Sequence, residues 1–227
     1  QQIVNESATV NYTIIATGGT QILHAGGNLA SNVLAGGTQL IAAGASLTAD
    51  VLGADLAIQA AVLDNGTQVL SGSSGQVATA TGFILIKIAS TSGVQIVDAN
   101  GVAVSTTVAE GGMQNISNGG TASNTTIASA GTQNISNGGL AESTTINSAG
   151  VQNISMGGTA KNTTINLSGI QNVLYSGTAD GVTINEGGTQ NLNKGSIVSN
   201  TKIKVGGSQN ILEGAEASGG IVSGTQV

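Results

Sequence analysis

Glutamine recurs along this chain at a nearly fixed interval, and each step from Gln95 to Gln209 is 19 residues. The recurring residues are Gln2, Gln21, Gln39, Gln68, Gln95, Gln114, Gln133, Gln152, Gln171, Gln190, Gln209 and Gln226. A fixed period of about 20 to 50 residues is typical of solenoid proteins, in which each repeat forms one layer of a stack. The period therefore predicts an elongated molecule whose surface repeats the same side chains, and such surfaces bind more often than they catalyse.

Each repeat contains short extended segments separated by glycine. In the repeat that begins at Gln114, apolar and polar residues alternate in Gln114–Ile116 and again in Thr125–Ile127. Gly119 and Gly120 lie between them, and glycine readily adopts the positive φ of a tight corner. Thr, Asn and Gly form helices poorly, and the repeat shows no 3.6-residue period. We therefore predict an all-β parallel β-solenoid with two or three strands in each 19-residue coil and layers about 4.8 Å apart.

The composition suits a narrow core and excludes several kinds of site. The apolar residues are mostly Ala, Val, Ile and Leu, with a single Phe and no Trp, Pro or Cys. Without Cys there are no disulfides and no thiolate metal sites. Five Lys and Arg residues in a chain of net charge −6 do not supply the basic cluster that nucleic-acid binding requires. We therefore expect no nucleic-acid partner and no cofactor.

The spacing of the repeats divides the chain into two parts. We expect one solenoid over residues 1–227, with irregular coils and an apolar outer face in 1–94 and regular 19-residue repeats in 95–227. The first part contains two longer units, which begin at Gln39 and Gln68. Each is predicted to be a full coil with an added extended piece, at 57–63 and at 83–88. Irregular coils of this kind often carry a bend, a protrusion or a binding loop, and simple drift of the sequence with local repacking is the alternative.

The alternation assigns each strand residue to the inside or the outside. The predicted inward residues are Ile116, Ile135, Ile154, Val173, Leu192 and Ile211, then Ile127, Ile146, Ile165, Ile184 and Ile203, and at a tight position Ala122, Ala141, Ala160 and Ala179. The recurring glutamine lies two residues before an inward aliphatic residue, so it shares that face. Because buried amides need partners, we predict a ladder in which each glutamine bonds to its counterpart one layer away. A row of ligand-binding glutamines is the alternative.

Two outward columns are polar, uncharged and regularly spaced. They consist of Asn115, Asn134, Asn153, Asn172, Asn191 and Asn210, and of Thr126, Thr145, Thr164 and Thr183. One interpretation is a soluble solenoid wall stabilised by its own side-chain ladders. The other is a self-association surface, on which many weak hydrogen bonds add through multivalency. These columns are our candidate self-association site.

The same outward columns become aliphatic toward the N-terminus. The residues of this candidate apolar interface are Ile3, Ile22, Leu40, Val69 and Ile96 in one column and Ile14, Val33 and Val51 in the other. A contiguous exposed aliphatic stripe is unusual on a monomer. Either the longer units pack over it, as in sheets that are covered on both faces, or it docks a partner or a further N-terminal segment.

An enzymatic alternative is a carbohydrate-active β-helix enzyme, which needs two carboxylates facing each other across a cleft. The acidic residues are spread along the chain, no column repeats an acid, and His24 is the only histidine. An ice-binding surface is also disfavoured, because only Thr126 of Thr125–Ile127 should face outward. We therefore predict that the protein is not an enzyme.

The repeat Gly-Gly-Thr-Gln-Asn-Ile-Ser-x-Gly-Gly-Thr-Ala-x-x-Thr-Thr-Ile resembles the 19-residue repeat of the AIDA-type self-associating autotransporter adhesins, the family of antigen 43 and TibA. The likeness is clearest from Gln95 to Gln209. It implies a right-handed parallel β-helix that serves as the passenger of a type V secretion system, on the bacterial cell surface and anchored to the outer membrane or secreted. It further implies adhesion to the host cell surface or matrix, autoaggregation through passengers on neighbouring cells, and biofilm formation.

Members of this family are often O-heptosylated, so the resemblance also implies a glycoprotein and a heptosyltransferase partner. The candidate O-glycosylation residues are Ser117, Ser136, Ser155, Thr126, Thr145 and Thr164. Neither a signal peptide nor a translocator barrel is visible, and both ends fall within the repeat pattern, so we expect a fragment or a processed passenger. A structural spacer stalk is the second alternative to an adhesive surface.

Overall fold

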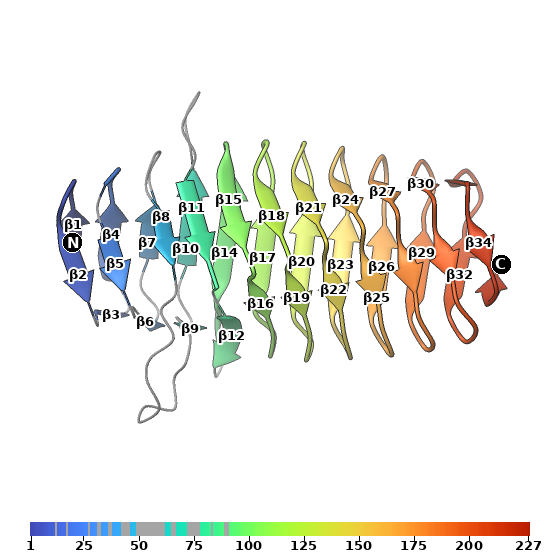
Figure 1. Ribbon diagram of the computed structural model, residues 1–227, viewed down its shortest axis with the longest axis horizontal. Coiled ribbons are helices and arrows are strands. Elements are labelled where there is room, and N and C mark those ends of the chain that lie inside the picture. The colour runs from blue at the N-terminus through green and yellow to red at the C-terminus, as the bar shows by residue number, and fades with distance from the viewer. Residues whose placement is uncertain are drawn as a thin grey trace.

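The computed structural model of this chain describes residues 1–11, 13–16, 18–26, 28–30, 33–35, 38–41, 46–48, 62–64, 67–71, 78–82, 84–88 and 91–227. Every regular element in these residues is a β-strand, and the strands form layers stacked along the long axis of the molecule (Figure 1). None of them contains a helix long and apolar enough to cross a membrane. The all-β parallel β-helix that the repeat predicts is confirmed.

The strands that carry the recurring glutamine form a 12-stranded sheet, paired in parallel throughout. In chain order they are β1 (Gln2–Val4), β4 (Thr20–Leu23), β7 (Thr38–Ile41), β10 (Thr67–Ser71), β14 (Val94–Asp98), β17 (Met113–Ile116), β20 (Thr132–Ile135), β23 (Val151–Ile154), β26 (Ile170–Val173), β29 (Thr189–Leu192), β32 (Ser208–Ile211) and β35 (Thr225–Gln226). The register places glutamine beside glutamine, as in Gln2 beside Gln21 and Gln190 beside Gln209. We call this the first sheet.

A second, nine-stranded sheet follows the glycine corner of each coil. Its strands are β8 (Ser46–Thr48), β11 (Ala78–Thr81), β15 (Gly101–Val104), β18 (Thr121–Ser123), β21 (Leu140–Glu142), β24 (Thr159–Lys161), β27 (Thr178–Asp180), β30 (Ile197–Ser199) and β33 (Glu216–Ser218), while β2 (Thr9–Asn11) and β5 (Asn28–Ala30) form a separate pair. Ala122 and Ala141 lie in register here and are fully buried. The tight position that the sequence assigns to alanine is therefore the middle of an additional strand in each coil, which comes between the glutamine strand and the Thr-Ile strand.

The third sheet contains the Thr-Ile pairs of the regular repeats. Its strands are β3 (Ile14–Ala16), β6 (Val33–Ala35), β9 (Val62–Asp64), β12 (Ile84–Ile88), β16 (Thr107–Val108), β19 (Thr126–Ile127), β22 (Thr145–Ile146), β25 (Thr164–Ile165), β28 (Thr183–Ile184), β31 (Lys202–Ile203) and β34 (Ile221–Val222), with β13 (Thr91–Ser92) on β12. All these pairs are parallel except β12 with β13.

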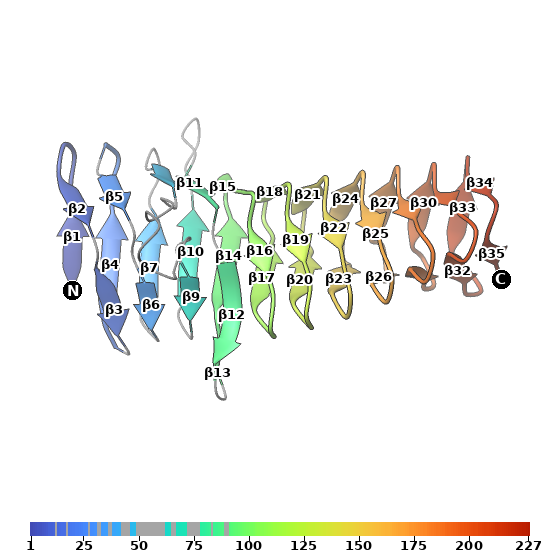
Figure 2. The ribbon, with the colours of Figure 1, turned by 60° about the horizontal axis from the view of Figure 1, so that its bottom comes forward.

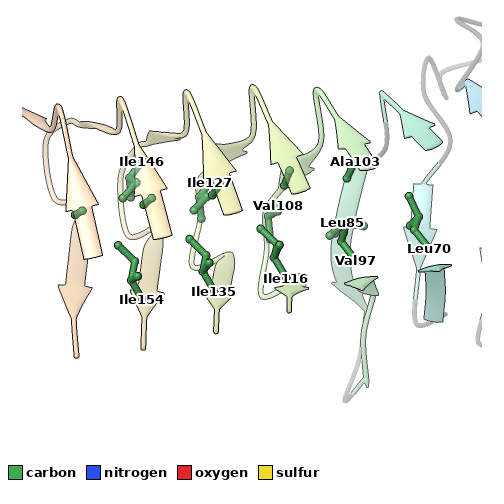
Figure 3. Close-up of a cluster of buried hydrophobic side chains, with 14 of the residues drawn as sticks. Leu70, Leu85, Val97, Ala103, Val108, Ile116, Ile127, Ile135, Ile146 and Ile154 are labelled. Carbon is green, nitrogen blue, oxygen red and sulfur yellow. The ribbon is translucent and has the colours of Figure 1, made fainter. Parts of the chain in front are cut away.

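The core lies between the three sheets and repeats its side chains from layer to layer. Ile135 and Ile154 of the first sheet point toward Ile127 and Ile146 of the third sheet (Figure 3). Every predicted inward residue is buried except Ile211, which is partly buried against the core. Burying an isoleucine contributes about 2 kcal/mol, so each layer depends on a few aliphatic side chains whose contacts come largely from the adjacent layers.

The two longer units leave the glutamine register intact. Gln39 pairs with Gln68 and Gln68 with Gln95, although 29 and 27 residues separate them. In the second unit the first residues of β12 keep the parallel register of the third sheet, while Lys87 and Ile88 extend beyond it and pair antiparallel with β13 (Figure 2). Residue 83 of the piece predicted at 83–88 lies outside the described residues. Of the piece predicted at 57–63, residues up to 61 lie outside the described residues.

Candidate binding surfaces

The recurring glutamines face the core and bind one another. From Gln21 to Gln209 they are buried, and the Nε2 group of each donates to Oε1 of the glutamine in the preceding layer at 2.6–2.8 Å. A further bond of 2.6 Å joins Gln226 to Gln209. The predicted amide ladder is confirmed, and it leaves no row of glutamines exposed for a ligand.

A threonine hydroxyl supplements the ladder in four layers, which the sequence analysis did not foresee. The Oγ1 atoms of Thr106, Thr125, Thr144 and Thr163 donate to the glutamine Oε1 atoms at 3.3–3.4 Å. Val182 takes this position one layer later, and Thr201 in the layer after that is buried with its hydroxyl unpaired. The signal was visible in the doubled threonine of Thr-Thr-Ile, whose first member must face inward when the second faces out.

The asparagine column lies on the outer face of the first sheet. Asn115 to Asn191 are half-buried and Asn210 is exposed. From Asn134 to Asn210, each Nδ2 group donates to Oδ1 of the asparagine in the preceding layer at 2.8–3.0 Å. An amide carries two N–H donors and an oxygen with two lone pairs. Within the column each amide uses one donor and one lone pair on its neighbours, so half of its capacity remains for a partner.

The threonine column lies on the outer face of the third sheet. Thr126, Thr145, Thr164 and Thr183 are half-buried and in register, and the column continues to Lys202. Beside it is a second outward ladder that our sequence analysis missed, in which Asn166 donates to Asn147 at 2.8 Å and Asn185 donates to Asn166 at 2.6 Å. The third sheet therefore presents threonine hydroxyls and asparagine amides in two adjacent columns.

The structure brings most of the aliphatic interface residues into register. Ile3, Ile22, Leu40, Val69 and Ile96 follow one another on the first sheet and continue into Asn115. Ile3 is 51% exposed, and the other four are half-buried.

On the third sheet, Ile14 is 70% exposed and pairs with Val33. Leu34 pairs with Leu63, so this column continues at Val62 in place of the predicted Val51. Val51 lies outside the described residues.

The candidate glycosylation residues are less accessible than other hydroxyls nearby. Ser117, Ser136 and Ser155 follow the ends of β17, β20 and β23 and are half-buried, as are the three candidate threonines. Exposed serines in the regular repeats instead include Ser129, Ser143, Ser148, Ser168 and Ser176. They lie in corners, where the presence of glycine nearby in the sequence was the available signal.

Neither the acids nor His24 form a catalytic cluster in the part of the chain that the structure describes. No group of three His, Cys, Asp or Glu side chains there could hold a metal ion. One acid has a perturbed titration: the pKa of Asp180 is lowered from its ordinary 3.8, first by a hydrogen bond from Ser199 and then by one from Asn200. Both donate to Oδ1, at 2.6 and 2.8 Å. The Gly181 N–H and the charge of Lys161 add to this effect.

This shift predicts a specific pH dependence of stability. Since the pKa of Asp180 is lower in the folded chain than in the unfolded chain, the ionised group stabilises the fold above the unfolded pKa, and this contribution is lost as the pH falls through the folded pKa. We expect Asp180→Asn to lower the free energy of unfolding at neutral pH and to have no effect in strong acid. Urea denaturation of both chains from about pH 7 to about pH 2 tests this, and a difference that persists in acid would contradict it.

Comparison with known proteins agrees with these repeats and this fold. Residues 137–188 match the family described as adhesin of bacterial autotransporter system, probable stalk. The chain is also similar to the crystal structure of a TibA fragment hyper-glycosylated by TibC, with a TM-score of 0.79 and 28% identity over 100% of this chain and 87% of that one. The resemblance to the AIDA-type autotransporter adhesins is thereby confirmed. No curated protein matches the chain in sequence. The AIDA-type likeness supports an adhesin passenger at the cell surface, with a structural rather than an enzymatic role.

Proposed function

We propose that this chain belongs to the passenger of a type V autotransporter, anchored to the outer membrane or released, and that it mediates adhesion, autoaggregation and biofilm formation. The observation that carries the proposal is the outward asparagine ladder, whose amides repeat in register over six layers with half of their hydrogen-bonding capacity unused. The partners would be a second passenger on a neighbouring cell and the host cell surface or matrix.

Repetition is what makes such a surface adhesive. A single hydrogen bond contributes only about 1 kcal/mol because it replaces bonds to water. When a second solenoid with the same layer spacing lies alongside, each further bond forms within an existing contact and needs no new encounter. The threonine and asparagine columns of the third sheet offer a second array of the same kind.

Glycosylation and the aliphatic column extend this proposal. A heptosyltransferase would modify serine or threonine hydroxyls, and the exposed corner serines such as Ser148 and Ser168 join Ser117, Ser136 and Ser155 as candidates. The hyper-glycosylation of the structurally similar TibA fragment supports this. The aliphatic column from Ile3 to Ile96 would serve as an additional interface.

We expect charge on the asparagine ladder to weaken self-association. Changing Asn115, Asn153 and Asn191 to Asp places carboxylates in alternate layers, about 10 Å apart, so each change removes both N–H donors of the amide and opposes a like charge on the partner. Displayed on a non-aggregating bacterium, with and without a heptosyltransferase, the chain should cause settling that falls at least several-fold in the triple variant.

The matched control places the same three charges at corners. Asn118, Asn137 and Asn162 have positive φ, which Asp also tolerates, and all three are exposed. The corner variant should settle like the parent. If the ladder variant also settles like the parent, while Ile22→Lys abolishes settling with the fold intact, self-association belongs to the aliphatic column instead.

A spacer stalk is the second candidate function, favoured by the stalk description of the matching family. A spacer that only holds an adhesive tip away from the cell loses reach gradually as layers are removed. An adhesive surface loses binding in proportion to the layers that carry the columns. Deleting whole 19-residue units and measuring both settling and the distance between paired cells separates the two.

A further inference from the structure

The outer face of the second sheet carries a symmetric pattern that neither the repeat nor the family explains. The first outward column of strands β21, β24, β27 and β30 is Leu140, Thr159, Thr178 and Ile197. It reads apolar, Thr, Thr, apolar in both directions. Ile197 is 50% exposed and the other three are half-buried. A column that reads the same in reverse can contact its own copy when the two solenoids run antiparallel.

The second outward column of the same strands carries charge. In the same order it is Glu142, Lys161, Asp180 and Ser199, paired in register. Lys161 is exposed, and Ser199 donates to Asp180 at 2.6 Å, which holds the carboxylate in place. Alone, this column is a short run of alternating charge with one excess negative charge.

A two-fold axis parallel to the strands and midway between β24 and β27 matches both columns at once. Such an axis places the face of the second copy against the same face of the first and reverses the order of the layers. Each column of the first copy then lies opposite the same column of the second copy. Lys161 then lies opposite Asp180 of the second copy, twice by symmetry. Leu140 lies opposite Ile197. Glu142 lies opposite Ser199, a pair that places no like charge there but adds no hydrogen bond, because the Ser199 hydroxyl already donates its proton to Asp180.

The corner that precedes these strands follows the same symmetry. Met156 and Tyr175 occupy equivalent corner positions before β24 and β27, and each is 65% exposed. About the same axis Met156 lies opposite Tyr175 of the copy, and a thioether against an aromatic ring is a favourable contact. Two large exposed apolar side chains, which water solvates poorly, thus meet each other.

Other axes on this face are worse. An axis through β24 sets Lys161 against itself and Glu142 against Asp180, and an axis through β27 sets Asp180 against itself. An axis between β21 and β24 pairs Glu142 with Lys161 but sets Met156 against an asparagine of the opposite corner. Like charges held face to face are destabilising, so charge and apolar matching select one register.

We propose that the outer face of β21, β24, β27 and β30 is a homotypic contact in which two copies of this chain pack antiparallel about the axis between β24 and β27. This deepens the proposed function and rests on it: stalks anchored by the same end on two facing cells run antiparallel. Four layers span only about 15 Å along the solenoid. The area that this face can bury is therefore well below the roughly 800 Å² that each partner of a stable dimer buries. The contact is therefore weak singly and acts through many copies.

Complementary charge reversal tests the register. Lys161→Glu places a second carboxylate opposite Asp180 of the copy, and Asp180→Lys places a second ammonium group opposite Lys161. Cells that display either variant should therefore settle several-fold more slowly than the parent. In a mixture of the two populations every pair across the axis is of opposite charge, so mixed cells should settle together and alternate in two-colour microscopy. Glu186→Lys, an exposed charge reversal at the corner after β28, is the control and should settle like the parent.

Cross-linking of the purified chain gives a test that does not depend on settling. The chain has no cysteine, so Leu140→Cys and Ile197→Cys introduce single thiols three layers apart, which the axis sets opposite each other while it keeps identical thiols well beyond the reach of a short linker. Facing sheets lie about 10 Å apart, which a bis-maleimide linker of that length spans. A mixture of the two variants should yield several-fold more dimer than either variant alone.

Equal yields would overturn the antiparallel register. If both charge variants settle like the parent, the face is not the contact, and the proposed function stands on another surface. If the parent itself does not settle, the proposed autoaggregation fails, and the cross-linking yields alone decide whether the face pairs in solution.

Discussion

Replacing Gln152 with alanine should lower the free energy of unfolding by about 3–5 kcal/mol. The Gln152 amide donates to Gln133 and accepts from Gln171, both at 2.6 Å, and it also accepts from Thr163. Removing it leaves the Gln171 Nε2 donor and the Thr163 hydroxyl without these partners, while Gln133 Oε1 keeps only the longer bond from Thr144, and each buried group left unpaired costs about 1–3 kcal/mol. A cavity in a fully buried position adds to this. Chemical denaturation followed by circular dichroism measures the loss.

The adjacent residue provides a matched control. Asn153 also bonds to its counterparts in both neighbouring layers, at 3.0 and 2.9 Å, but it faces outward and is half-buried. Water can satisfy the groups that Asn153→Ala leaves behind, so we expect a loss of about 1 kcal/mol or less. Equal losses at the two positions would show that burial does not distinguish the ladders, and would contradict our account of the glutamine period.

The sequence predicted the regular part of the fold because a stacked amide ladder requires its own residue at the same place in every layer. The constant step from Gln95 to Gln209 therefore specified the register. Alternation then assigned the neighbours of each glutamine, which is why the inward isoleucines and the outward asparagines were placed correctly. Both inferences use only period and alternation, and neither needs an alignment of homologues.

Where the 19-residue period is broken, counting from the glutamines no longer assigns each residue to its column. Counting from the glutamines assigned Val51 to a column that the strand pairing continues at Val62. Counting also treated the piece at 83–88 as an addition to a coil, whereas β12 is the third-sheet strand of that coil, paired in parallel with β9 and β16, and only Lys87 and Ile88 pair antiparallel with β13. Inserted residues shift the count by an amount that the sequence does not reveal, and only the hydrogen-bonded register restores it.

The candidate surfaces were predictable to different degrees for a related reason. Columns of one residue type, such as the outward asparagines, are visible as repetition. The face of the second sheet combines residues that differ in every layer, and its symmetry emerges only when strand pairing shows which residues are neighbours. Side chains that vary between layers are thus invisible to a search for repeats, although they can specify a partner more narrowly than a uniform column does.

Replacing Gly131 with alanine should destabilise the fold by about 3 kcal/mol. A Cβ atom at this corner would lie 2.1 Å from the carbonyl oxygen and 2.5 Å from the carbonyl carbon of Val108 in the preceding layer. These are backbone atoms, and Ala128 N–H donates to that oxygen at 2.9 Å. The new methyl group therefore cannot be accommodated by rotating a side chain and must push two layers apart.

Gly119→Ala separates this steric effect from the conformational preference of glycine. Gly119 has a φ of 85°, but a Cβ atom there would meet nothing within 4 Å. Alanine at positive φ costs about 1 kcal/mol, so Gly119→Ala should be the milder change in the same denaturation experiment. Hydrogen exchange should show faster exchange in the layers next to residue 131 in Gly131→Ala, because their ladder bonds are stretched, while distant layers keep their protection. If Gly119→Ala proved the more damaging of the two, backbone conformation rather than the close approach of layers would explain the corner glycines.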